Sequence, residues 1–493
     1  MKPLGTITIC LPHVDDETRA VLQSVMEEAE DFGDFARRLS SRVCSESTTP
    51  LAEYLASFFA YMICEYNILN TLERAGKISE MSDPFLLQSK NRRGQRVTWD
   101  EMKQSIQKAI KAAPNDWIAG HLYLLWRTSA EEDFPECDTD VSPIETLIEG
   151  VREDKDLEYL KAYLLRIQLP KLRREGNDQV FIDTCNQALV LARKYDDQIM
   201  VADLLPLLAF RTKITDMKRG TDILYSAKSL SEQLDYKEGL ASVQHQLGGI
   251  MGVRGELDAA IEHNLQGRTV WESISYPTTG VNSVIAYFFN VSGNGEKALE
   301  FVETAIGTID SRRRWVSYAH AQKAWALINL GRNEEAEAEI SKARKLAPLA
   351  GDTAMLVLLD LIEGILDKSE KRYDNAVQTF VRVLNTTVDP LRRSVCLLNL
   401  TEIEIEMLPK ESLQANIDSS GPWMDKLNEH IGKNDYPGIA ARAMILKAKL
   451  SQKQGRYDEV RKLLKEVLKA AESPSMRYLN DIVVSTFPDV IVS

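Results

Sequence analysis

The sequence predicts an all-α protein built from stacked helical hairpins. A short pattern recurs in the second half of the chain, in which a glycine, or in one case a lysine, precedes one or more acidic residues and then a small or apolar residue. The aligned final residues of this pattern are Ala260, Ala298, Ala336, Ala376 and Val460. Their spacings are 38, 38, 40 and 84 residues, and the last equals two periods. A fixed period of this length is typical of helical-repeat proteins.

The residue that opens each pattern predicts where a helix ends. In the same order these residues are Gly255, Gly293, Gly331, Lys371 and Gly455. Glycine ends a helix readily because its left-handed conformation meets no Cβ. The acidic residues that follow favour the start of the next helix. Each pattern therefore marks the turn of a helical hairpin.

The residues after the turn form one apolar helix face. Four residues beyond the aligned position lie Asn264, an exception, and Val302, Ile340, Phe380 and Leu464. Seven residues beyond it lie Gly267, Ala305, Ala343, Val383 and Val467. Positions i, i+4 and i+7 share one side of a helix. Prolines at 277, 348, 390, 437 and 474 are expected at helix ends.

These features resemble the tetratricopeptide repeat family. Its small eighth residue would correspond to Gly248, Ala286, Ala324, Gly364 and Ala448. The best single match runs from Ala324 to Pro348. The period exceeds the family's usual length of about 34 residues, which implies longer helices or loops. The phrase from Leu234 to Ile250 is also similar to the repeat arms of large prokaryotic regulators. The resemblance implies a right-handed superhelical solenoid.

Three regions are predicted along the chain: a distinct helical N-terminal region at 1–97, the solenoid at 98–475, and a C-terminal cap or tail at 476–493. Helices are expected at 15–40, 50–75, near 83, and at 99–114, 117–127, 143–152, 156–174 and 178–194. A degenerate repeat is expected near 411–430. Residues 1–11 are interpreted as a strand or extended segment without the features of a secretory signal.

Composition narrows the class of protein. Of 493 residues, 44% are hydrophobic and 27% charged, and no run approaches the roughly 18 apolar residues of a membrane span. The six cysteines are scattered without a C-x-x-C pair, which argues against disulfide or zinc frameworks and favours reduced thiols in a cytoplasmic protein. A net charge of −13 disfavours a nucleic-acid partner.

The resemblance implies a concave groove lined by the first helix of each repeat, which binds a protein or peptide. Carried over residue by residue, the groove positions are His245, Tyr287, Asn290, Tyr318, Trp325 and Asn329, and further along Lys368, Arg442, Lys449 and Gln452. Aromatic side chains offer large contact areas, and asparagine can bond a peptide backbone as donor and acceptor. The alternative interpretation is that these side chains pack between repeats.

The N-terminal segment contains a motif that resembles zinc-dependent sugar N-deacetylases. The carried-over residues are His13 and Asp16 as zinc ligands and Asp15 as the general base. Val14 stands where that family has proline, and no further histidine pair supplies a third ligand. The alternative is that Asp15 or Asp16 caps the first turn of a helix. No other catalytic motif is found, so neither enzyme activity nor a cofactor or metal is predicted.

The sequence thus predicts a protein–protein interaction scaffold that binds its partner in the concave groove. The alternative is a transcription regulator whose residues 1–97 form an atypical DNA-binding head and whose repeats form a sensor arm. Residues 66–78 are similar to the first helix of a winged-helix module, and Lys90, Arg92, Arg93 and Arg96 form a basic stretch after it. Such a stretch suits contacts to phosphates.

Overall fold

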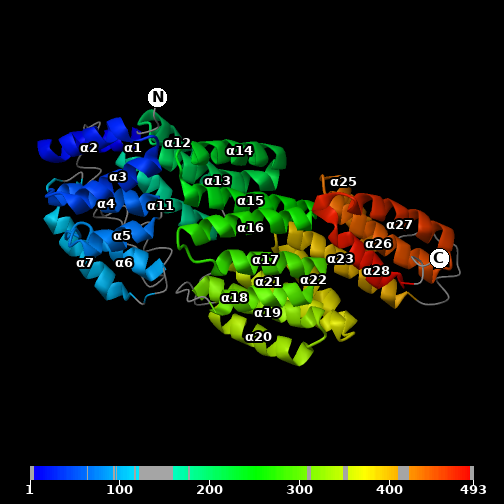
Figure 1. Cartoon of the computed structure of the whole chain (residues 1–493). Coiled ribbons are helices and arrows are strands. Elements are labelled where there is room, and N and C mark those ends of the chain that lie inside the picture. The colour runs from blue at the N-terminus through cyan, green and yellow to red at the C-terminus, as the bar shows by residue number, and fades with distance from the viewer. Residues whose placement is uncertain are drawn as a thin grey trace. The chain divides into compact units, whose positions relative to one another are not determined.

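The computed structural model describes residues 5–63, 65–92, 95, 97–115, 118–120, 159–175, 178–307, 313–347, 353–408 and 421–488. Every regular element in these ranges is a helix, which confirms the all-α prediction (Figure 1). The structure divides into two compact units. The first comprises Met1–Gln246, Gly267–Thr278 and Ile309–Arg312, and the second Leu247–Gln266, Thr279–Thr308 and Arg313–Ser493. The region boundaries predicted at 97 and 475 stay predictions.

The first unit begins with short helices. They are α1 (Gly5–Cys10), η1 (Leu11–His13), α2 (Asp16–Glu28), α3 (Phe32–Ser45), α4 (Pro50–Met62), α5 (Tyr66–Arg74), α6 (Asp83–Arg92) and α7 (Trp99–Ala112). The helices predicted at 15–40 and 50–75 are each two helices instead. The first break follows from the sequence, because the Asp31 carboxylate accepts the Asp34 N–H at 2.7 Å and so starts a new helix.

The strand or extended segment predicted for residues 1–11 is wrong for the part that the structure describes, which begins at residue 5. Residues Gly5–Cys10 form α1. Ile7 and Cys10, three residues apart, are both buried, and α1 packs against α13. A helix places residues three apart on the same side, whereas a strand places them on opposite faces. Burial against a helix more than 180 residues further along the chain therefore decides this conformation.

The first unit continues with longer helices. They are α11 (Leu160–Glu175), α12 (Asp178–Lys194), α13 (Gln198–Thr215), α14 (Met217–Gln233), α15 (Lys237–Arg254) and α16 (Leu257–Ser273), of which the last two extend into the second unit. Helix α11 packs on α12, and α13 packs on α14. The helices predicted at 99–114 and 178–194 are confirmed as α7 and α12 within two residues. The helix predicted at 156–174, which the structure describes from residue 159 on, corresponds to α11 within one residue. Those predicted at 117–127 and 143–152 lie mostly outside the described residues.

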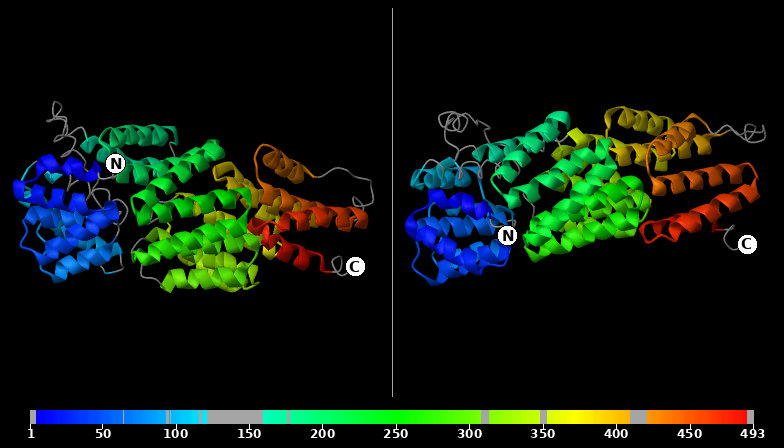
Figure 2. Two further views of the ribbon diagram at one scale, coloured as in Figure 1. Left: turned by 45° about the horizontal axis from the view of Figure 1, so that its top comes forward. Right: turned by 90° about the horizontal axis from the view of Figure 1, so that it is seen from above.

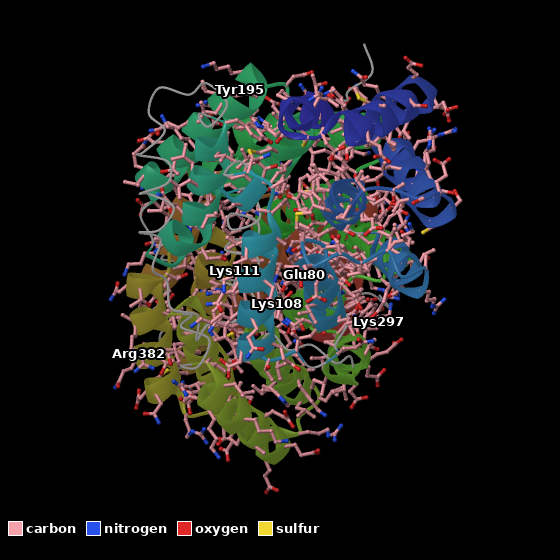
Figure 3. The ribbon with its side chains drawn as sticks, turned by 90° about the vertical axis from the view of Figure 1, so that its left-hand side faces the viewer. Glu80, Lys108, Lys111, Tyr195, Lys297 and Arg382 are labelled. Carbon is pink, nitrogen blue, oxygen red and sulfur yellow. The ribbon has the colours of Figure 1, made fainter. Side chains whose placement is uncertain are left out.

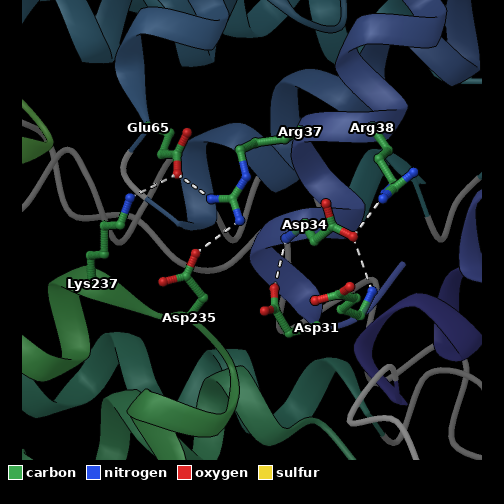
Figure 4. Close-up of polar contacts among 8 residues, drawn as sticks. Asp31, Asp34, Arg37, Arg38, Glu65, Asp235 and Lys237 are labelled. Carbon is green, nitrogen blue, oxygen red and sulfur yellow. Dashed lines mark hydrogen bonds and ion pairs between the residues drawn. The ribbon is translucent and has the colours of Figure 1, made fainter. Parts of the chain in front are cut away.

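A charged cluster joins the N-terminal helices to the turn between α14 and α15 (Figure 4). The guanidinium group of Arg37 on α3 bonds the carboxylates of Glu65 at 2.7 Å and Asp235 at 2.9 Å. Lys237 also contacts Glu65, at 3.3 Å. The Gly33 N–H donates to the carbonyl of Leu234 at 3.3 Å. The N-terminal helices are thus attached to a repeat turn within the first unit.

The second unit is a series of hairpins. Its helices are α17 (Thr279–Ser292), α18 (Gly295–Gly307), α19 (Arg313–Asn329), α20 (Asn333–Leu346), α21 (Thr353–Ser369), α22 (Tyr373–Thr386), α23 (Pro390–Met407), α25 (Pro422–Gly432), α26 (Pro437–Lys453), α27 (Tyr457–Ala471), η3 (Pro474–Met476) and α28 (Tyr478–Thr486). Successive pairs pack together (Figure 2). Helix α25 occupies most of the described part of the predicted degenerate repeat, of which residues 411–420 lie outside the described residues.

The predicted turn residues have the left-handed conformation. Gly255, Gly293, Gly331 and Gly455 have φ between 73° and 87°, and Lys371 has φ 61°. After each of these five residues, the next N–H bonds a carbonyl five residues back at 2.8–2.9 Å, for example from Arg332 to Leu327 and from Arg372 to Asp367. This bond satisfies a carbonyl that the helix end would leave unpaired. The repeat turns are therefore confirmed, including the turn that lacks glycine.

Replacing Lys371 with glycine should stabilise the protein. The left-handed conformation costs a residue with a Cβ roughly 1 kcal/mol, which glycine does not incur. We expect Lys371→Gly to raise the free energy of unfolding by about 0.5–1 kcal/mol in urea titrations. Lys371→Ala is the control, because it removes the long side chain but keeps the Cβ. Equal stabilisation by both variants would contradict this explanation.

The predicted apolar faces pack as expected. All five aligned residues, from Ala260 to Val460, have no exposed surface. Asn264, the exception, is also fully buried, and its Nδ2 donates to the carbonyl of Ala260 at 2.7 Å. Gly364 adjoins the ring of Phe380, where a Cβ would lie 2.8 Å from the ring. Small residues thus allow the paired helices to approach closely.

Four of the five prolines predicted at helix ends lie in the connection after one helix or at the first position of the next. Pro390, Pro437 and Pro474 are the first residues of α23, α26 and η3, and Pro277 lies between α16 and α17. Proline suits the first helical position because its missing N–H would be unpaired there anyway. Pro348 lies outside the described residues.

Among the helices described, none is long and apolar enough to cross a membrane.

Candidate partner-binding groove

Two of the predicted groove aromatics pack against each other. Tyr287 on α17 and Trp325 on α19 are 7% and 3% exposed. Their ring centroids are 5.7 Å apart at an interplanar angle of 75°, an edge-to-face arrangement. Burial raises the pKa of the Tyr287 hydroxyl well above its usual range. In this conformation both side chains hold the first helices of adjacent repeats together, and a role in partner binding stays a prediction.

The predicted asparagines connect the same two helices. The Nδ2 of buried Asn290 donates to the carbonyl and the Oε1 of Gln322, at 2.9 and 3.1 Å. The Nδ2 of Asn329 donates to the carbonyl of Asn290 at 3.1 Å. These bonds join α17 to α19, so the amide groups of Asn290 and Asn329 form hydrogen bonds between adjacent repeats. Binding of a partner's backbone by Asn290 and Asn329 remains a prediction.

The remaining predicted residues are more accessible. Tyr318 on α19 is half-buried, with its ring 6.0 Å from that of Trp315. His245 is also half-buried, with its ring 5.9 Å from that of Trp271, but it lies in the first unit. The structure therefore brings Tyr287, Trp325 and the two asparagines together between α17 and α19, whereas His245 belongs to the other unit.

A charged cluster lies on three successive first helices of the second unit. Glu402 on α23 bonds the ammonium groups of Lys368 on α21 and of Lys449 on α26, the latter at 2.5 Å. Lys368 also donates to the Oδ1 of Asn399 at 2.8 Å. Each of the three charged side chains keeps 22–26% of its surface exposed. The cluster is thus partly open to solvent.

The electrostatics of this cluster favour anions. Burial opposes the charged form of Glu402, but the two neighbouring ammonium groups outweigh this effect and lower the pKa of Glu402 to about 2. Because Lys368 and Lys449 share one carboxylate, they keep one net positive charge. Arg442 on α26 adds another, and its Nη1 bonds the carbonyl of Val291 at 3.1 Å.

Sequence reasoning identified only part of the cluster. Lys368, Arg442 and Lys449 are groove positions implied by the family resemblance, whereas Glu402 and Asn399 were missed. Both lie on α23, in the repeat where the pattern is degenerate and the spacing doubles to 84 residues. Without an aligned turn, the first helix of that repeat had no register from which to assign groove positions.

A small pocket adjoins the cluster. It offers about 80 Å³ of space. Its lining residues are Leu398, Asn399, Glu402, Arg442, Ile445, Leu446, Lys449, Ile482 and Thr486. Pockets for cofactors or drug-sized ligands typically have roughly 300–1,000 Å³. This pocket can hold waters or one inserted side chain, with apolar walls beside a positively charged end.

The motif at His13–Asp16, which resembles that of zinc-dependent sugar N-deacetylases, caps a helix. The Asp15 carboxylate accepts the N–H and the hydroxyl of Thr18, at 2.7 and 2.9 Å, and Asp16 pairs with Arg19 at 2.7 Å. This arrangement confirms the alternative interpretation of the motif. Within the described residues, no group of three His, Cys, Asp or Glu side chains is placed to hold a metal ion.

The described N-terminal residues give no support to a DNA-binding head. Residues 66–74 form α5, and the described part of 5–92 contains helices without strands for a wing. Lys90 pairs with Glu73 at 2.6 Å, while Arg93 and Arg96 lie outside the described residues. Helix α7 does carry exposed Lys108 and Lys111 (Figure 3), but two lysines on a helix surface are also typical of a solvated face.

The fold and the groove define a helical-repeat protein whose first helices carry the candidate binding residues. Residues 317–348, within α19 and α20, match the sequence model described as tetratricopeptide repeat. This is the hairpin that best matched the family pattern in the sequence. The described part of the chain is thus a helical-repeat fold with one hairpin that matches the tetratricopeptide repeat.

The solved structures that match this chain include two whose names are informative. One is a Rap protein complexed with competence and sporulation factor, at 13% identity and a TM-score of 0.47, covering 72% of this chain and 98% of that chain. The other is the TPR domain of P58(IPK), at 13% identity and a TM-score of 0.23. That match covers 79% of this chain and 97% of that chain. No curated protein matches the chain.

Proposed function

We propose that this protein is a scaffold that binds an acidic segment of a protein or peptide partner in the groove of its second unit. The observation that supports this most is the charged cluster on α21, α23 and α26. Two ammonium groups share one carboxylate there, and Arg442 lines the adjoining pocket together with apolar residues. An anionic side chain or chain terminus would compensate the remaining positive charge.

The contrast with the rest of the chain strengthens this proposal. The whole protein carries a net charge of −13, which disfavours an acidic partner on most of its surface. A local positive site within a negative molecule therefore selects where such a partner binds and in which orientation. The apolar wall residues Leu446 and Ile482 would contact an apolar side chain next to the acidic group.

The proposal is tested by affinity capture from a native lysate with two substitutions at the cluster. Lys449→Met and Arg442→Gln each remove one positive charge and approximately keep the side-chain size. We expect the double variant to lose a specifically enriched partner by at least about tenfold, because charge-assisted hydrogen bonds contribute roughly 1.5–3 kcal/mol each. Tyr287 and Trp325 are unsuitable positions because they are buried, and their loss would disturb the fold.

The matched control is Lys462→Met on α27, an exposed lysine on the second helix of the same hairpin. Circular dichroism must show equal helix content in all three proteins. Equal capture of the same partner by wild type and the double variant would refute the cluster as the binding site. Capture that the Lys462 variant also loses would point to nonspecific charge attraction instead.

A further inference from the structure

The first and last repeats of the second unit contact each other. The hydroxyl of Tyr478 on α28 donates to the carbonyl of Gly255 at 2.9 Å, and its backbone N–H donates to Asp258 Oδ2 at 2.9 Å. Arg254 forms an ion pair with Asp435, just before α26. These partners are 181 to 223 residues apart in the chain. The turn between α15 and α16 is thereby joined to the C-terminal helices.

Two glycines allow this contact. A Cβ on Gly255 would lie 2.6 Å from the backbone nitrogen of Ile439, and one on Gly438 would overlap the carbonyl of Gly255. The start of α26 therefore rests directly on the backbone of the turn after α15. Any side chain at 438 would push these two segments apart.

Helix α28 completes the contact. It packs against α17, α26 and α27 (Figure 1). Its residues Tyr478, Leu479 and Val483 are buried. Ile482 and Thr486, on the same helix, line the pocket beside the charged cluster. The helix thus lies both at the contact and at the wall of the candidate groove.

This contact leaves little space in the groove. The pocket has about 80 Å³, far below the roughly 300 Å³ at the lower end for small-molecule sites. Arg442 reaches across to the carbonyl of Val291 on α17, and most residues of α17 are buried. A peptide cannot occupy the same space while these helices remain in contact.

The contact differs in character from the cores of the hairpins. Beside the backbone packing of Gly255 on Gly438, it includes two hydrogen bonds and one ion pair, and Asp435 in that pair is 76% exposed. The α26–α27 hairpin has its own apolar core, which includes Val460, Leu464 and Val467. In repeat proteins each hairpin is stabilised chiefly by its neighbours along the chain. The contact can therefore open while the hairpins remain folded.

We propose that the contact of the α15–α16 turn with α26 and α28 is a latch that closes the groove, and that a partner enters only when this latch opens. The nature of the partner rests on the proposed function above, whereas the latch is tested without any partner. The partner's binding free energy would shift the population from closed to open molecules.

The test compares Gly438→Ala with Gly432→Ala by hydrogen exchange and lysine acetylation, both read by mass spectrometry. Alanine favours a helix at both positions, but only the methyl group at 438 disrupts the contact, since nothing lies within 4 Å of a Cβ at 432. We expect Gly438→Ala to speed amide exchange in α28 about tenfold or more. Lys449, in the pocket wall, should be acetylated by N-hydroxysuccinimide acetate several-fold faster.

The reference sites are the amides of the α21–α22 hairpin and the exposed Lys462, which should not change. Tyr478→Phe, which removes only the hydroxyl bond, should speed exchange in α28 in the same direction by roughly threefold. Unchanged exchange and acetylation in Gly438→Ala would overturn the latch. If amide exchange in α21–α22 speeds up as much as in α28, the latch is overturned as well. The contact would then be part of the core that stabilises the whole second unit and could not open separately. Neither readout depends on whether the Lys449 and Arg442 substitutions lose a partner.

Discussion

Phe380→Ala should lower the free energy of unfolding of the second unit by about 3–5 kcal/mol. Phe380 on α22 has no exposed surface, and its ring packs onto Gly364 of α21. Because glycine has no side chain that could move into the space, the cavity left by the ring cannot be filled from that side. The expected loss is therefore near the upper end for a buried aromatic residue.

Urea unfolding followed by circular dichroism measures this loss, and hydrogen exchange shows where it acts. Exchange should increase most in α21 and α22 and less in the flanking hairpins, because each repeat mainly stabilises its neighbours. The matched control is Tyr457→Ala, since Tyr457 on α27 is 54% exposed. It should change stability by no more than about 0.5 kcal/mol. Similar losses in both variants would mean that the α21–α22 packing is not as described.

Glu402→Gln should destabilise the second unit by about 2–3 kcal/mol at pH 7. The substitution removes the negative charge shared by Lys368 and Lys449 and leaves two ammonium groups close together. Removing one partner of a largely buried ion pair is costly because the remaining charge has lost its compensation. The partial exposure of about 26% keeps the expected loss below that of a fully buried pair.

The pH dependence of this effect has a definite sign. The pKa of Glu402 is about 2 in the folded protein, against an ordinary value of 4.5. A carboxylate whose pKa is lowered by folding contributes stability that is fully present above about pH 4.5 and is lost as the pH falls toward 2. The difference in urea midpoint between wild type and Glu402→Gln should therefore shrink from pH 5 to pH 3.

Glu406→Gln is the control for this experiment. Glu406 lies one turn further along α23 and pairs with Lys453 at 3.3 Å, but it is 43% exposed. An exposed pair contributes roughly 0–1 kcal/mol, so this variant should stay close to wild type at every pH. If the Glu402 and Glu406 variants behave alike, the two-lysine cluster has no special role in stability.

Local patterns predicted the repeats well. The turn glycines, the aligned alanines and the apolar faces all depend on residues within one hairpin, and each is found as predicted. The errors arose where distant packing overrides local preference. Residues 5–10 are helical because Ile7 and Cys10 are buried in the first unit. Glu402 was missed because its repeat lacks the aligned turn.

The candidate site was predicted less completely than the fold. Family positions named Lys368, Arg442 and Lys449, which the structure brings to one cluster and its pocket. The same positions named Tyr287, Asn290 and Trp325, which are buried. The helix register in the sequence predicts which side chains lie on the inner face of a first helix. It does not predict whether another part of the chain covers that face.

The sequence by itself determined that this protein is a helical repeat, where its hairpins turn, and which residues pack within each pair. These features follow from helix periodicity and turn conformation, which act over a few residues. The tertiary structure alone decided that Gly255 meets Gly438 and Tyr478, and so how much of the groove is covered. That contact depends on small rotations added over several successive repeats, and no short stretch of sequence encodes their sum.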